Sequence, residues 1–299
     1  MIDPIIFSFN IGSLTFALRW YGVLIMLGIV VSAWMTTLLL KKRGEDPEWI
    51  WDMLLWLVIG GVLGARIWYV INATIGGSQY YVNNPIQIIN IPQGGLHFYG
   101  AMVGGAIALI FYCKKRKLDL LLFMDSVAPA LLIGQALARP ANFINQELYG
   151  QPTTLPWGIP IESAHRLTEY SDPLLFPDST RFHPTFAYEM IWNFITGGLM
   201  LWVMHKFSKK VKPGAVFAAW LVLAGIGRII IETWRPDQPV IPGTMLSYTR
   251  LVSILMAVVG AVALLYIYKI IRPAFMKPPR EQYLVSKGYP QPVEKKKSK

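Results

Sequence analysis

The residues best suited to chemistry gather in the stretch RPANFINQELYG, which runs from Arg139 to Gly150. It follows an apolar segment, LLLFMDSVAPALLIGQALA, that is long enough to cross a membrane. Charged and amide side chains are rare and unfavourable at such a place, and they commonly mark functional sites. A guanidinium offers forked donors that suit phosphate oxygens. This stretch therefore predicts an anion-binding site at the end of a membrane helix.

The composition predicts the elements that must position this stretch. The chain has 299 residues, of which 54% are hydrophobic and 15% are charged, against roughly 25% charged residues in soluble domains. Several apolar segments have the length that crosses a bilayer core of about 30 Å. We expect an all-α integral membrane protein with seven transmembrane helices, at residues 18–40, 50–71, 97–113, 119–138, 184–204, 214–233 and 246–271.

The loops between these segments alternate in charge, which predicts their orientation. Basic loops, such as KKRK from Lys114, alternate with loops that are almost free of Lys and Arg. By the positive-inside rule, the N-terminus faces outward and the C-terminus is cytoplasmic. The net charge of +11 is then mainly topological, and no nucleic-acid partner is expected.

The apolar segments and the charge of the loops also predict how the chain is divided into regions. Residues 1–271 are expected to form the transmembrane domain, and its outer loop at 140–183 is long enough to be a small extracytoplasmic head. Residues 272–299 are expected to form a basic, disordered cytoplasmic tail. With one Cys and four scattered His, no disulfide, metal site or cofactor is expected.

Polar residues from several helices are expected to meet near the outer surface. A rise of about 1.5 Å per residue places Arg139, Arg66 and Arg228 in the outer part of their helices, about 30, 24 and 21 Å from the inner ends. Helices that run the other way begin near the same level, with Tyr21, His97, Tyr99 and Glu189 in their first turns. Arginines at this depth suggest an anionic lipid headgroup as the ligand.

Structural roles compete with binding for some of these residues. Arg66 can simply pair with a carboxylate. Arg228 has Glu232 one helical turn onward, so this pair can be structural. Glu189 and Glu147 lie near the same level and are able to hold arginines in place. We therefore favour Arg139 and Arg228 as the ligand-binding arginines.

Several motifs occur in the order found in a known family. The strongest is Arg139–Gly150; the others are RWYG (19–22), GARIWYV (64–70), GGLHFYGA (94–101), HPTFAYE (183–189) and GRIIIETWRPD (227–237). Together they resemble the prolipoprotein diacylglyceryl transferase family, and the resemblance covers nearly the whole chain apart from the tail.

The resemblance implies an activity in the bacterial inner membrane. Family members transfer the diacylglyceryl group of phosphatidylglycerol to the thiol of a lipobox cysteine in a preprolipoprotein, which releases glycerol 1-phosphate. The implied partners are therefore phosphatidylglycerol, the signal peptide with its lipobox cysteine, and membrane lipid. The active site is expected to face the outer leaflet.

The resemblance also implies roles for residues of this chain. By this resemblance, the essential arginines of the family correspond to Arg139 and Arg228, and the functional tyrosine of the family corresponds to Tyr21. We expect Arg139, Arg228, Tyr99 and Tyr21 to be catalytic. The expected substrate-binding residues are Arg139, Asn142, Asn145, Glu147, Gly150, Arg66, His97, Glu189, Glu232 and Arg235.

The chain departs from the family pattern in two places that matter here. Tyr99 stands where many members have a histidine proposed as a base, while His97 lies two residues earlier. The Gly-Gln pair of the family reads Thr249–Arg250. If a base is needed, Tyr99, His97 and water all remain candidates.

A mechanism without a metal follows from the arginines. The peptide thiol must be deprotonated to attack, and nearby positive charge lowers its pKa from about 8.5. The same charge stabilises the departing phosphate. We expect Arg139 and Arg228 to clamp the phosphate, Asn142 to donate a further hydrogen bond, and Glu147 and Glu232 to orient the arginines.

Two other classes of membrane protein fit the sequence less well. A transporter usually has internal repeats and a site near the midplane, whereas no repeat is seen here and the polar level lies further out. A membrane protein that binds lipid headgroups without enzyme activity is a further alternative to the transferase, together with the transporter. An intramembrane protease with paired aspartates is disfavoured because Asp52 and Asp125 lie near the inner ends of their segments.

Overall fold

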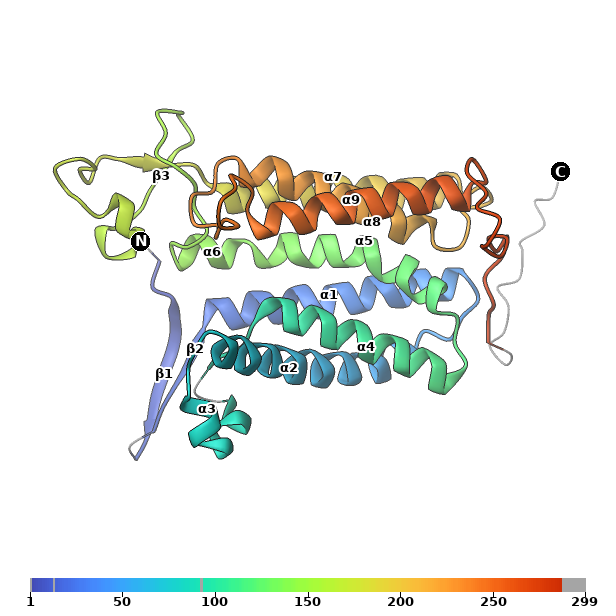
Figure 1. The fold of residues 1–299 in the computed structure, drawn as a ribbon, viewed down its shortest axis with the longest axis horizontal. Helices are drawn as coiled ribbons and strands as arrows, with labels where there is room; N and C mark the ends of the chain where they lie inside the picture. The colour runs from blue at the N-terminus through green and yellow to red at the C-terminus, as the bar shows by residue number, and fades with distance from the viewer. Residues whose placement is uncertain (1, 13, 92–93, 287–299) are drawn as a thin grey trace. The chain divides into compact units, whose positions relative to one another are not determined.

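Helices dominate the computed structural model, which describes residues 2–12, 14–91 and 94–286 (Figure 1). The long ones are α1 (Trp20–Lys42), α2 (Trp49–Ile75), α4 (Phe98–Arg116), α5 (Leu120–Ala138), α7 (Thr185–Lys206), α8 (Ala215–Glu232) and α9 (Tyr248–Ile267). Each lies within a few residues of an expected span. Helices α1, α2, α8, α9 and the stretch Leu120–Ile144 are long and apolar enough to cross a membrane. The protein is therefore a multi-pass membrane protein.

Short elements connect the long helices. Two small antiparallel ribbons are present: β1 (Ile5–Ile11) pairs with β2 (Leu14–Arg19), and β3 (Ile159–Pro160) pairs with β4 (Arg181–Phe182). The sequence did not predict the first ribbon, because residues 1–17 were expected to form an outer loop and residues 18–19 to begin the first span. The remaining short elements are α3 (Tyr80–Asn83), η1 (Pro85–Ile89), α6 (Pro140–Ile144), η3 (Ser163–His165) and η4 (Thr168–Tyr170).

The chain divides into two compact units. Unit 1 contains residues 1–35 and 124–282, and unit 2 contains residues 36–123 and 283–299. Helices α1 and α5 each pass from one unit to the other. The two units are described separately below.

In unit 1, helices α7, α8 and α9 pack side by side (Figure 1). Small residues bring α8 and α9 close together, because a Cβ added at Gly225 would lie 2.5 Å from the carbonyl oxygen of Ser253. The buried Asp125 fixes the start of α8 by accepting hydrogen bonds from the backbone N–H groups of Gly214 (2.6 Å) and Phe217 (2.7 Å). A carboxylate at a helix N-terminus is also favoured by the helix dipole.

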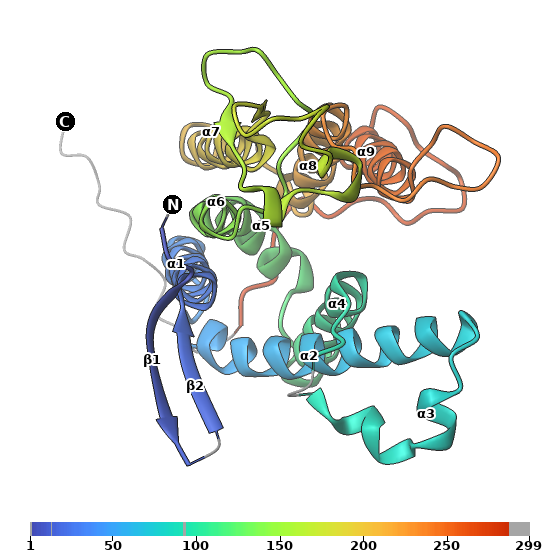
Figure 2. The same ribbon diagram turned by 90° about the vertical axis from the view of Figure 1, so that its left-hand side faces the viewer.

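The loop after α6 forms a small head with a core of its own. Tyr149, Ile161, Tyr170 and Phe182 are buried against one another, and the aromatic rings of Tyr149 and Phe182 are 5.0 Å apart. Figure 1 shows this segment beyond the ends of α7 and α8, and Figure 2 shows it from the end, in front of these helices. Burial raises the pKa of the Tyr170 hydroxyl to about 12, so this group stays neutral.

In unit 2, α2 and α4 pack through glycines. A Cβ added at Gly64 would lie 2.3 Å from the carbonyl oxygen of Gly100, and one added at Gly104 would lie 2.2 Å from that of Gly60. This pairing runs in opposite directions along the two helices, so they are antiparallel. Only residues without a Cβ permit such an approach, which is the basis of many helix contacts in membranes.

The expected disordered tail lies partly outside the described residues, which end at residue 286. Within unit 1, the Glu281 carboxylate pairs with Lys212 (3.0 Å) and with Lys269. Within unit 2, the backbone N–H of Ser286 donates to Glu45 (2.9 Å), and that of Leu284 donates to Asp119 (2.8 Å). Residues 281–286 are therefore held by specific contacts.

Candidate active site

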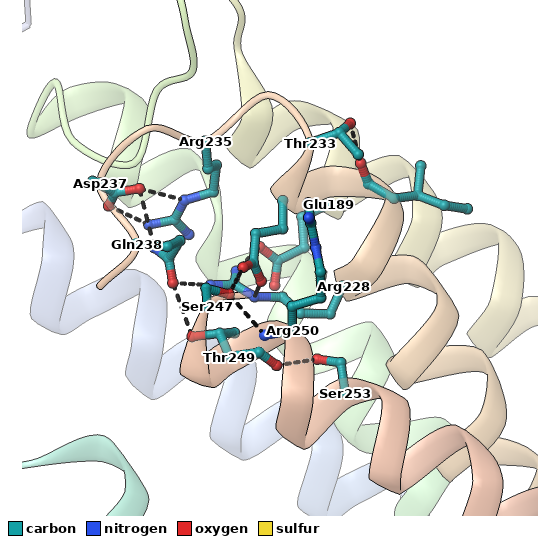
Figure 3. A network of polar contacts seen from close by, with 12 residues as sticks. Glu189, Arg228, Thr233, Arg235, Asp237, Gln238, Ser247, Thr249, Arg250 and Ser253 are labelled. Atoms are coloured by element: carbon teal, nitrogen blue, oxygen red, sulfur yellow. Dashed lines mark hydrogen bonds and ion pairs between the residues drawn. The ribbon is translucent and has the colours of Figure 1, made fainter. Parts of the chain in front are cut away.

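The centre of the candidate site is one carboxylate that contacts two arginines. Glu189, near the start of α7, accepts a hydrogen bond from Nη2 of Arg139 on one oxygen. Its other oxygen lies 3.9 Å from Nη1 of Arg228, which is on α8 (Figure 3). All three side chains are largely but not fully buried. Unit 1 thus brings together three residues that are distant in the sequence.

Local structure at the end of α5 positions Arg139. The chain turns here into the short helix α6, which begins at Pro140, and proline is favoured at a first helical position. Gln146 and Leu148 then adopt left-handed φ angles of 53° and 55°. This tight reversal returns the chain toward α6, where the backbone N–H of Glu147 donates to the carbonyl oxygen of Asn142 (3.0 Å).

Asn142 links Arg139 to Glu147. Its Oδ1 accepts from Nη1 of Arg139 (3.3 Å), and its Nδ2 donates to Oε1 of Glu147 (2.8 Å). Asn145 donates to the same carboxylate oxygen (3.4 Å). Tyr21, at the start of α1, interacts electrostatically with both Glu147 and Arg139. Glu147 is therefore linked to Arg139 through Asn142.

A second set of contacts holds Arg228. Its Nε lies 3.9 Å from the buried carboxylate of Glu232, one turn along α8, and its Nη2 donates to Gln238 (3.2 Å). Glu232 also accepts a hydrogen bond from the hydroxyl of Ser247, and Thr249 donates to Gln238 (2.9 Å). The start of α9 thus completes the support of Arg228 (Figure 3).

Arg235 is engaged by a neighbouring acid. Its guanidinium donates to both carboxylate oxygens of Asp237, at 3.0 and 2.5 Å. Burial alone would raise the pKa of Asp237, but the hydrogen bonds and charge of Arg235 outweigh it and lower that pKa. The contacts of Arg235 are thus those of a structural pair beside the site.

Gly150 permits a close crossing of three segments. Its backbone N–H donates to the carbonyl oxygen of His183 (2.7 Å). A Cβ at this position would lie 2.5 Å from the carbonyl oxygen of Trp234 and 2.8 Å from Cγ2 of Thr185. The glycine of the motif thus serves packing next to the site.

His183 and Tyr188 belong to an aromatic group at the start of α7. Nδ1 of His183 lies 3.0 Å from the hydroxyl of Tyr188, which also accepts from Nε1 of Trp157 (2.8 Å). The ring of Trp234 packs against the rings of His183 and Tyr188. Burial lowers the pKa of His183, so its imidazole is preferentially neutral.

Arg66 belongs to unit 2, where its guanidinium organises a loop. It donates to the carbonyl oxygens of Gln87 (2.5 Å), Ile88 (2.8 Å), Gly94 (2.7 Å) and Gly95 (3.2 Å). These bonds engage all three of its nitrogens. Arg66 was expected either to bind substrate or to pair with a carboxylate. It bonds instead to backbone carbonyls, and a ligand would have to compete with them.

His97 and Tyr99 also belong to unit 2. His97 directly precedes α4 in an extended conformation, so its ring is free to stack on Tyr99, with ring centres 5.6 Å apart. Two residues at positions i and i+2 of a helix do not face each other, so their rings would not stack in this way. Its Nδ1 is buried and has no hydrogen-bond partner within the described part of the chain.

Four residues of the site were not expected from the sequence. They are Asp237, Gln238, Ser247 and Thr249. Asp237 is the last residue of the motif that carries Arg235, and Gln238 directly follows it, so proximity was a usable signal. Ser247 has the signal of a helix cap, since its hydroxyl accepts from the backbone N–H of Arg250 (2.9 Å).

Comparison with known proteins decides the family. Residues 4–266 match the family described as prolipoprotein diacylglyceryl transferase. The chain belongs to this family. The match includes every residue of the candidate site. The resemblance found in the motifs is therefore confirmed over nearly the whole chain.

Individual members of the prolipoprotein diacylglyceryl transferase family support the same assignment. A phosphatidylglycerol–prolipoprotein diacylglyceryl transferase of Bifidobacterium adolescentis is 38% identical over 79% of this chain and 70% of its own length. A protein of the same name from Leifsonia xyli is 38% identical over 75% and 67%, respectively. One from Synechococcus elongatus is 34% identical over 89% and 90%.

Proposed function

We propose that this protein transfers the diacylglyceryl group of phosphatidylglycerol to the lipobox cysteine of preprolipoproteins. The observation that carries the proposal is the Glu189 carboxylate shared by Arg139 and Arg228, in a member of this transferase family. Two guanidinium groups fixed by one acid present several donors to one anion. The names of the relatives specify phosphatidylglycerol and prolipoprotein as substrates.

The placement in the membrane is part of the proposal. Seven helices cross the bacterial inner membrane, with the N-terminus outside, the C-terminus in the cytoplasm and the active site open to the outer leaflet. Support comes from the seven long helices and from the basic residues at the ends of α1, α4 and α7. The positive-inside rule places these ends in the cytoplasm.

The reaction is a substitution at the glycerol carbon that carries the phosphate ester. A bond forms between the cysteine sulfur and this carbon, and the carbon–oxygen bond to phosphate breaks. The electron pair of that bond leaves with glycerol 1-phosphate, and the thiol proton is released to a base or to the leaving phosphate. Arg139 and Arg228 stabilise the charge that develops on the phosphate.

The remaining residues position these groups. Glu189 fixes the spacing of the two guanidiniums, and Asn142 connects Arg139 to Glu147. Tyr21 interacts electrostatically with both Arg139 and Glu147. Glu232, held by Ser247, supports Arg228. The base stays as predicted from the sequence: Tyr99, His97 or water.

A direct test uses purified protein in detergent, phosphatidylglycerol labelled in its glycerol backbone, and a lipobox peptide. We expect a peptide whose mass has increased by the labelled diacylglyceryl group, and no product when the peptide cysteine is replaced by serine. No product from folded protein would overturn the proposal. A flux assay in vesicles would then test the transporter alternative.

A further inference from the structure

Asn193 is a carboxamide on α7, one helical turn further from the outer end of this helix than Glu189. The residue is only 4% exposed. Its Nδ2 is buried and has no hydrogen-bond partner among residues 2–12, 14–91 and 94–286. A buried amide without a partner is unfavourable, and polar groups at membrane depth commonly mark functional sites. Asn193 therefore has an unused donor directly below the carboxylate that holds the two arginines.

The packing of α7 against α5 places this amide relative to Arg139. At the outer level, Nη2 of Arg139 donates to Glu189. Further inward, a Cβ added at Gly197 of α7 would lie 2.9 Å from Cδ1 of Ile133 on α5. These two contacts fix an antiparallel register between the helices. Asn193 lies midway between them along α7, one turn inward from the level of Arg139.

The facing stretch of α5, residues 135–137, leaves Asn193 without a polar partner. Ala136 is fully buried (0% exposed) and apolar. Gln135 is exposed, and its side chain forms no hydrogen bond within the described part of the chain. An amide on the surface of an apolar membrane segment is also unfavourable. Two carboxamides at the same level of adjacent helices therefore have donors to offer.

The space between α5 and α7 increases toward the outer end. At Gly197 the helices touch without a side chain from α7, whereas at the outer level the two long side chains of Arg139 and Glu189 bridge them. Asn193 lies between these two levels. A lipid whose phosphate is held at Arg139 can thus extend inward along the exposed edge at Gln135 toward Asn193.

We propose that Asn193 and Gln135 donate hydrogen bonds to the ester carbonyls of the diacylglyceryl group while its phosphate is held at Arg139. The inference rests on the proposed transferase function. The glycerol backbone separates the phosphate from the ester carbonyls by a length comparable to one helical turn of about 5.4 Å. Ester carbonyls are uncharged acceptors, which neutral amide donors suit. Both esters stay intact in the reaction, so the amides position the carbon that carries the phosphate for attack.

The first test compares phosphatidylglycerol with its diether analogue, which has the same headgroup and chains but no ester carbonyls. Transfer to the lipobox peptide is measured for both lipids with the wild type in the same detergent micelles. We expect the KM for the diether lipid to be about 3- to 10-fold higher for each hydrogen bond that is lost. Equal KM values for the two lipids would overturn the inference.

Variants assign this preference to the two amides. Asn193→Leu keeps the approximate shape of the side chain but removes its donors. We expect it to raise the KM for phosphatidylglycerol about 3- to 10-fold and to leave the KM for the diether lipid unchanged. Gln135→Leu should act in the same direction, and the double variant should treat the two lipids almost alike. Asn193→Thr, which keeps one donor, should recover part of the effect.

A matched control is Asn72→Leu. Asn72 is an exposed asparagine of α2 in unit 2, and its Nδ2 donates to the carbonyl oxygen of Trp68 in its own helix (2.9 Å). This variant should prefer the diester as the wild type does. An equal rise of both KM values in Asn193→Leu would indicate a general disturbance of the site and would overturn the inference.

Thermal stability separates lipid binding from a structural role. Because Nδ2 of Asn193 has no partner to lose, Asn193→Leu should unfold at the wild-type temperature or higher. A lower unfolding temperature together with an unchanged preference for the diester would show that the amide supports the fold and does not contact the lipid.

A failure of the proposed function is distinguishable from a failure of this inference. If the wild type transfers nothing, binding of labelled phosphatidylglycerol and of its labelled diether analogue in mixed micelles, without peptide, still tests the two amides. A preference for the diester that is lost in Asn193→Leu supports the contact. Equal binding of the two lipids by the wild type overturns it.

Discussion

The guanidinium of Arg228 lies 3.9 Å from the carboxylate of Glu189, on the preceding long helix of the chain. This distance is longer than that of a direct hydrogen bond. The Nη1 group of Arg228 is therefore held near Glu189 electrostatically and stays available as a donor, while Nη2 is bonded to Gln238. An anion that binds between Arg228 and Arg139 can thus form short contacts without displacing the acid.

Neutralising Glu189 should separate binding from catalysis. In Glu189→Gln, the two arginines lose their shared negative charge, so the site becomes more positive but less ordered. We expect kcat for diacylglyceryl transfer to fall about 10- to 100-fold, within the usual range for disturbed electrostatic catalysis, while the KM for phosphatidylglycerol stays equal or decreases. Steady-state kinetics with varied lipid measures both. A raised lipid KM with unchanged kcat would contradict the positioning role.

The forked donors of the two arginines should be indispensable. Arg139→Lys and Arg228→Lys keep a charge but lose the planar fork that matches phosphate. We expect each to reduce transfer by at least about 100-fold and to remain folded, as judged by thermal unfolding in detergent. Near-normal transfer by either variant would remove that arginine from the proposed site.

Gly150 should tolerate no side chain. In Gly150→Ala, the new Cβ meets the backbone oxygen of Trp234 at 2.5 Å, and a backbone atom cannot move aside cheaply. We expect a loss of about 1–3 kcal/mol in the free energy of unfolding, as for other overpacked sites. Gly198→Ala is the control, since a Cβ there meets nothing within 4 Å. Equal melting temperatures for the two variants would show that the crossing is looser than the geometry indicates.

The stability should depend on pH through His183. Its pKa is lowered from the usual 6.5 by burial, so the unfolded chain binds this proton more readily than the folded one. The contribution of His183 to stability is therefore present above pH 6.5 and is lost as pH falls below it. We expect the melting-temperature difference between the wild type and His183→Gln to shrink as pH falls from about 7 to 5. A difference that is constant with pH would contradict this.

Arg66 should act through the loop that it organises. Arg66→Met removes its bonds to the carbonyls of Gln87, Ile88, Gly94 and Gly95. We expect faster proteolysis of this loop and a destabilisation of about 3 kcal/mol, comparable to the loss of hydrogen bonds to a charged group. The surface-paired Arg116→Gln should change stability by no more than about 1 kcal/mol. Wild-type resistance to proteolysis in Arg66→Met would exclude this role.

The sequence predicted the long helices well, because apolar length is a direct consequence of bilayer thickness. It predicted β1 and β2 poorly. In this ribbon, strands expose large apolar residues such as Phe7 and Phe9, so the usual sign of a half-buried strand is absent. Pairing also depends on the partner strand, which no local pattern specifies.

The proximity of the central charged residues of the candidate site was predictable, whereas its supporting residues and its connections were not. Depth along each helix correctly grouped Arg139, Glu189 and Arg228. It did not predict that Asn142 would stand between Arg139 and Glu147, because contacts of that kind depend on rotamers and on the left-handed turn after α6. The partners of Arg66 were missed for a similar reason, since backbone carbonyls have no signature in a sequence.

The head is joined to the helices by a narrow neck. The backbone N–H of Gly150 donates to the carbonyl of His183 (2.7 Å), and that of His183 donates to the carbonyl of Gln151 (3.0 Å), so the chain leaves and returns at the same point. An insertion with joined ends places little constraint on the structure that carries it. The length of the segment between them can therefore change while Arg139 and Glu189 keep their places, provided that the contacts of Trp157 with Tyr188 and of the head core with Tyr149 are kept.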